Sequence, residues 1–114
     1  MGEKIRPYKW REDQQRGTEM WVAGGIQFRL NVCKADGYCE NHEHFFDHIT
    51  TVYNDFMLLR GDEKEWRLLP AGSSEFIPRW VMHTFKPVPK DGIDEYKFVC
   101  SWLLDWEKVS RERP

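Results

Sequence analysis

The sequence predicts an all-β protein folded as a single barrel or sandwich, and three observations support this. Short apolar segments rich in β-branched and aromatic residues recur about every 8 to 12 residues. Turn-forming pairs such as Gly24-Gly25 and Asp36-Gly37 separate them. No segment has the periodicity of an amphipathic helix, apart from a single turn expected from Asp105 onward. Regular short strands of this kind are typical of sandwiches and barrels.

The clearest predicted strand covers residues 26–33. Phe28 and Leu30 alternate there with Arg29 and Asn31, which is the period-two pattern of a half-buried strand. The other predicted strands lie between successive turn signals, at residues 19–23, 45–53, 56–60, 65–69, 75–77, 81–86 and 95–106.

The length of 114 residues fits one domain. Residues 1–18 are polar and include Pro7 and Gly17, so they are expected to form an irregular N-terminal arm. Residues 19–114 are then expected to form the barrel. Six Trp, four Tyr and seven Phe supply enough bulk for one core.

The composition argues against several classes of function. The 17 basic and 19 acidic residues are mixed along the chain, with a net charge of -2 and no basic stripe of the kind that nucleic-acid binding requires. No apolar run reaches the length of a membrane span, and residues 1–10 lack the apolar core of a secretion signal. A cytoplasmic protein with neither a nucleic-acid nor a membrane partner is expected, with Cys33, Cys39 and Cys100 as reduced thiols.

All four histidines fit one metal site. His42, His44 and His48 lie within seven residues, and His83 lies in a later predicted strand. Residues of equal parity share a face of a strand, and positions i and i+2 are about 7 Å apart. On one continuous strand the three even-numbered imidazoles would point the same way, and His83 from a facing strand would complete the site. Imidazole suits Fe, Zn, Ni and Cu, so these ligands do not select the metal.

Two neighbouring side chains are rival ligands. Cys39 could join His42 and His44 in a zinc site if the chain before the strand folded back. Asp47 could replace His48 if a β-bulge shifted the parity of the strand.

The spacing of the first three histidines resembles the first motif of the cupin superfamily, which reads G-x5-H-x-H-x3,4-E-x6-G. His42, His44, His48 and Asp55 follow its intervals. His48 stands where the family usually has Glu, and Asp55 replaces a glycine. Gly37 lies one residue closer than the first glycine of the family.

The second cupin motif, G-x5-P-x-G-x2-H-x3-N, is matched in every interval by Gly72, Pro78, Trp80, His83 and Pro87. Trp80 replaces a glycine and Pro87 replaces an asparagine. Together the two motifs cover nearly half of the chain.

The resemblance to small RmlC-like cupins implies a double-stranded β-helix, in which two antiparallel sheets form a jelly-roll barrel with a metal in its mouth. It implies that His42, His44 and His83 are metal ligands. It also implies His48 as a fourth ligand, which changes the metal chemistry because an imidazole replaces the usual carboxylate. Four neutral imidazoles leave the full charge on a divalent ion, which favours an anionic or enolisable ligand. The resemblance also implies a homodimer formed through residues 1–33.

The expected function is a non-haem, metal-dependent oxygenase acting on a small organic substrate. Fe²⁺ is the favoured cofactor, with Zn²⁺, Ni²⁺, Mn²⁺ and Cu²⁺ as alternatives. A cupin lyase or isomerase with a metal-stabilised enolate, and a non-catalytic module that binds a small molecule or a metal, are the rival interpretations.

Four residues near the histidines are candidates for substrate contact. Thr50 shares the parity of His48, and Trp102 lies on the last predicted strand. Trp80 and Met82 flank His83 within the second motif. Tyr53 has the opposite parity and is expected to point outward. Three arginines could bind a substrate carboxylate, and the sequence does not rank them: Arg29, Arg60 and Arg79.

Overall fold

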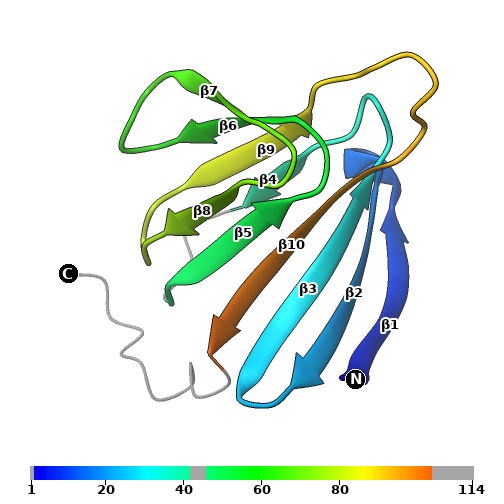
Figure 1. Cartoon of the computed structure of the whole chain (residues 1–114), viewed down its shortest axis with the longest axis vertical. Coiled ribbons are helices and arrows are strands. Elements are labelled where there is room, and N and C mark those ends of the chain that lie inside the picture. Colours follow the sequence, from blue (N-terminus) through cyan, green and yellow to red (C-terminus); the bar gives the residue numbers. More distant parts are fainter. Residues whose placement is uncertain (1, 42–45, 104–114) are drawn as a thin grey trace.

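The computed structural model describes residues 2–41 and 46–103, and within them two antiparallel sheets face each other (Figure 1). The larger sheet has the strand order β1-β2-β3-β10-β5-β8, and the smaller one has the order β4-β9-β6-β7. This architecture confirms the all-β prediction. The strands are β1 (Glu3–Arg11), β2 (Arg16–Ala23), β3 (Ile26–Cys33), β4 (Cys39–Asn41), β5 (His48–Val52), β6 (Phe56–Arg60), β7 (Trp66–Leu69), β8 (Ser74–Ile77), β9 (His83–Pro87) and β10 (Tyr96–Leu103).

The hairpin of β2 and β3 forms where the turn signal predicted it. Its ladder runs from the pair Arg16–Cys33 to the pair Ala23–Ile26, and Gly24 turns the chain at a φ of 55°. A positive φ is a conformation that glycine adopts without steric cost. The predicted strand over 26–33 is therefore confirmed at both ends.

The irregular arm predicted for residues 1–18 is wrong. Glu3–Arg11 forms β1, which pairs with β2 at the edge of the larger sheet, with register shifts on both sides of Arg6. Most of its side chains are exposed, so the strand lacks the apolar alternation that identifies a half-buried strand. The ring of Tyr8 covers Gly17 on the neighbouring strand and occupies the space of a missing side chain. The expected dimer contact through residues 1–33 stays a prediction.

The single strand predicted over residues 45–53 is also wrong at its start. Phe46 lies in a bend, Asp47 lies outside any strand, and β5 begins at His48. β4 belongs to the smaller sheet and β5 to the larger one, so the chain passes between sheets in this region. Parity along one strand therefore does not relate His48 to the histidines before it.

The face of β3 that points into the barrel is the polar one. Arg29 pairs with Cys100 and Asn31 pairs with Phe98, and both partners are buried. Directly paired residues of antiparallel strands lie on the same face of a sheet. The alternation in β3 was recognised correctly, but its side chains at odd positions, not Phe28, line the interior.

A chain of aromatic rings connects the core to the histidines. Phe98 contacts Phe56 and Phe85 at ring-centroid distances of 5.2 and 5.3 Å, and Phe85 contacts His83 at 5.7 Å. These three phenylalanines are fully buried. The three cysteines are buried, and burial raises the pKa of Cys33 to about 12.

A network of charged residues joins the two sheets along one side. Glu75 of β8 accepts hydrogen bonds from Arg60 of β6 at 2.7 Å and from Arg67 of β7 at 2.6 Å. The two guanidinium groups, with Arg67 first, hold the pKa of Glu75 below its usual value. The charged carboxylate is therefore stabilised in the folded state.

We expect Glu75→Gln to lower the free energy of unfolding by about 1 kcal/mol at pH 7. Because the folded-state pKa of Glu75 is depressed, its contribution is complete above the unfolded pKa of about 4.3 and is lost as the pH falls through the folded value. Urea unfolding at pH 7 and pH 3 should give a clear difference between variant and wild type only at pH 7. An equal difference at both pH values would contradict this assignment.

In the part of the chain that the structure describes, no helix has the length and hydrophobicity needed to cross a bilayer.

Candidate functional site

Two buried histidines from opposite sheets meet inside the barrel. His48 begins β5 and His83 begins β9, and they are only 3% and 2% exposed. Burial alternates along both strands, so His48 shares the inner face with Thr50, and His83 shares it with Phe85. The two imidazole centroids are 4.9 Å apart, with their planes at 48°. The fold therefore brings together residues 35 positions apart in the sequence.

The protonation of His83 follows from its surroundings. Its Nδ1 lies 2.9 Å from the carbonyl oxygen of Val81, and because a carbonyl only accepts, Nδ1 carries the proton and donates it. Burial lowers the pKa of His83, an effect that the Val81 hydrogen bond opposes and the charges of Arg29 and Arg60 increase. The neutral ring then carries its lone pair on Nε2, which is the form that binds metals, with the other nitrogen fixed by a carbonyl.

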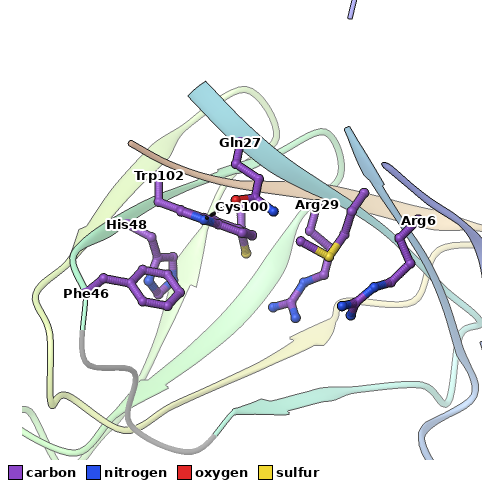
Figure 2. A pocket seen from close by; sticks show the side chains of 8 residues that line it. Arg6, Gln27, Arg29, Phe46, His48, Cys100 and Trp102 are labelled. Atoms are coloured by element: carbon purple, nitrogen blue, oxygen red, sulfur yellow. Dashed lines mark hydrogen bonds between the residues drawn. The ribbon is translucent and has the colours of Figure 1, made fainter. Parts of the chain in front are cut away.

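A cavity of about 240 Å³ opens beside His48 (Figure 2). Phe46 and Trp102 stand near His48 at one end, with ring centroids 5.3 Å apart, and Arg6 and Arg29 stand at the other end. Its lining residues come mainly from the larger sheet: Arg6, Met20, Gln27, Arg29, Phe46, His48, Cys100 and Trp102. The indole nitrogen of Trp102 donates to Gln27 at 3.3 Å.

The predicted metal ligands are only partly within the described residues. His48 and His83 lie together, whereas His42 and His44 fall outside the described part of the chain. Within residues 2–41 and 46–103, no three side chains of metal-binding type form a group. Convergence of all four imidazoles stays a prediction.

The rival ligands lie elsewhere. Asp47 is exposed and accepts a hydrogen bond from the backbone nitrogen of Arg79 at 2.8 Å. Cys39 is fully buried in the apolar core, where it pairs with Phe85. Of the two residues that compete for the third ligand position, His48 is the one that points inward beside His83.

Only one of the four candidates for substrate contact lines the cavity, and it is Trp102. Thr50 is buried and its hydroxyl lies 3.3 Å from the thiol of Cys100. Met82 is 50% exposed. Trp80 has a φ of 69°, which explains why the motif has a glycine at this position.

The structure also ranks the three arginines. Arg29 lines the cavity, Arg60 is bound by carboxylates, and Arg79 lies over the ring of Trp80 at 5.9 Å. Sequence reasoning missed Arg6, because no periodic pattern marks β1 as a strand. It also missed Gln27, although its odd position in β3, shared with Arg29, was a signal that could have identified it.

No protein-family model matches this sequence, and no curated protein matches it significantly. Solved structures do match. An RmlC-like cupin with a double-stranded β-helix fold from Methanocaldococcus jannaschii superposes with a TM-score of 0.65 at 15% identity, over 86% of this chain and 89% of its own. The chain has the cupin fold.

Two other matches agree with this cupin architecture. A protein of unknown function from Vibrio parahaemolyticus gives a TM-score of 0.68 at 13% identity, over 85% of this chain and 97% of its own. Hydroxypropylphosphonic acid epoxidase (HppE) from S. wedmorenis gives 0.65 at 20% identity, over 85% of this chain and 55% of the epoxidase. The iron(II) form of HppE gives 0.67 at 19% identity. This chain therefore spans about half of the epoxidase chain.

Proposed function

We propose that this cupin is a metal-dependent enzyme, and that it is a non-haem oxygenase acting on a small organic substrate. The observation that carries the proposal is the pair of buried imidazoles, His48 and His83, of which His48 lines a cavity. His42 and His44, from the first motif, would supply the remaining ligands. The same fold in the iron(II) enzyme HppE supports iron as the favoured ion.

The donor set fits a divalent transition ion. His83 is held neutral by burial, and its Nδ1–H is tied to Val81, so Nε2 is the nitrogen suited to ligation. Imidazoles add no negative charge, so a bound ion would keep its full charge. Such an ion would supply Lewis-acid chemistry and, if it is iron, one-electron chemistry.

The residues of the cavity would position the substrate. Trp102 is oriented by its hydrogen bond to Gln27 and packs against Phe46, and these rings cover the side of the cavity beside His48. Aromatic walls there limit the access of water and hold an organic group against the histidines.

The test is metal analysis of protein purified without added metal, followed by oxygen-uptake measurements on the iron-loaded protein. We expect about one divalent ion per chain and oxygen uptake with at least one member of a panel of thiols, diketones and hydroxylated aromatic acids. Zinc or nickel as the native ion, without oxygen uptake, would favour a lyase or isomerase. A protein that binds no divalent ion would contradict the proposal.

A further inference from the structure

A row of paired residues crosses the larger sheet and carries two arginines to the cavity. Arg6 of β1 pairs with Met20 of β2, which pairs with Arg29 of β3. Arg29 in turn pairs with Cys100 of β10. Directly paired side chains share a face, and the burial of Cys100 identifies this face as the inner one. Figure 2 shows Arg6 and Arg29 at the end of the cavity away from Phe46.

Neither arginine is neutralised by a carboxylate within residues 2–41 and 46–103. The side chain of Arg29 is half-buried, and its Nε is buried without a hydrogen-bond partner there. In contrast, Arg60 and Arg67 share the carboxylate of Glu75. Removing a guanidinium group from water is costly unless hydrogen bonds or an opposite charge replace its hydration. A bound anion would provide both.

The two guanidinium groups at one end give the cavity a positive electrostatic potential. Potential of one sign in a cleft with low-dielectric walls concentrates ligands of the opposite charge.

The dimensions of the cavity restrict the ligand to a small molecule. Its volume of about 240 Å³ is below the range of roughly 300 to 1,000 Å³ that is usual for drug-sized ligands. Its two ends also differ in character, since Arg6 and Arg29 lie opposite the rings of Phe46 and Trp102. A suitable ligand is short, with a charged group at one end and an organic group at the other.

We propose that Arg6 and Arg29 bind the oxyanion group of a small substrate, a carboxylate or a phosphoryl group, at the end of the cavity away from Phe46. The organic part of the substrate then lies along Trp102 and reaches His48. Guanidinium groups suit this role because their planar fork donates two parallel hydrogen bonds to such a group. That the bound anion is a substrate rests on the proposed function. Binding of the anion by Arg6 and Arg29 does not require the metal.

The test is calorimetric titration of metal-free protein with methylphosphonate and with propionate at constant ionic strength. We expect Arg29→Gln to weaken binding at least about tenfold and Arg6→Gln to weaken it less, because hydrogen bonds to charged groups have effects of this size. Arg11→Gln is the matched control, since Arg11 lies on the same strand as Arg6 but outside the cavity, and it should keep the wild-type affinity. The tighter of the two ligands identifies the oxyanion class.

A second measurement covers the case in which Arg29→Gln fails to fold. The Nε–H signal of Arg29 in a ¹⁵N spectrum of the wild type, assigned by its loss in Arg29→Lys, should shift during either titration. Equal affinity in wild type and Arg29→Gln, or an unshifted Nε–H signal at saturation, would overturn the subsite. Arginine-dependent anion binding in a protein that takes up no metal would overturn only the proposed metal chemistry.

Discussion

Replacing His83 by alanine is expected to lower the affinity of this protein for divalent iron by more than about 100-fold. Removing only the residue that hydrogen-bonds to a metal ligand already lowers the metal affinity about 10- to 100-fold. The His83 substitution removes the proposed ligand itself, so its effect should be larger. The remaining histidines would leave the ion with fewer nitrogen donors. Competition with a chromogenic chelator under anaerobic conditions measures the loss.

Thr50→Ala is the matched control for this prediction. Thr50 is as buried as His83 and lies on the same face of β5 as His48, but it belongs to no proposed ligand set. Its affinity for iron should stay within about twofold of the wild type, which separates ligation from general damage to the barrel. A ligand also stabilises the folded state, so iron should raise the melting temperature of wild type and Thr50→Ala but not of His83→Ala. Wild-type affinity in His83→Ala would remove the basis of the metal site.

Phe98→Ala is expected to destabilise the protein by about 3 to 5 kcal/mol. Phe98 is fully buried and its ring contacts both Phe56 and Phe85, so its removal leaves a cavity between the two sheets. The loss is a large fraction of the roughly 5 to 15 kcal/mol that holds an ordinary domain folded. Thermal unfolding followed by circular dichroism should show a melting temperature lower by more than about 10 °C.

The control for the core variant is Phe76→Ala. Phe76 is on β8 and is 54% exposed, so the same deletion there should change the free energy of unfolding by less than about 1 kcal/mol. If the two variants lose similar stability, the aromatic cluster around Phe98 is not the principal core.

The sequence predicted most strands because their ends carry turn residues. Gly24-Gly25 marked a hairpin that the structure contains. Asn54-Asp55 also suits a hairpin turn, but the strands on its two sides, β5 and β6, lie in different sheets. β1 was missed for a physical reason: an edge strand exposed to solvent needs no apolar face, so only its partner strand reveals it. The inner face of β3 could not be assigned from the sequence, because alternation shows that a strand has two faces but does not show which one is covered. Arg29 faces inward there and Phe28 outward, which depends on the neighbouring strands.

For the site, the motif intervals related His48 to His83, whereas side-chain parity along one strand did not. His48 and His83 do lie together, but they approach from opposite sheets, and no continuous strand leads into His48. The motif intervals depend on the barrel topology, whereas parity describes only a single strand. The cavity could not be foreseen from the motifs, since Arg6 reaches it from a strand at the far edge of the sheet.

The edge position of β1 has a consequence for how strongly the proposed anion would bind. An exposed outer strand, interrupted on both sides of Arg6, is the kind of element that frays at little energetic cost while the rest of the barrel stays intact. Arg6 can hold a ligand only while β1 is attached, so the apparent affinity is scaled by the attached fraction. Saturating anion should in turn slow amide hydrogen exchange along β1. The exchange rate of these amides would then report how much of the anion subsite is occupied.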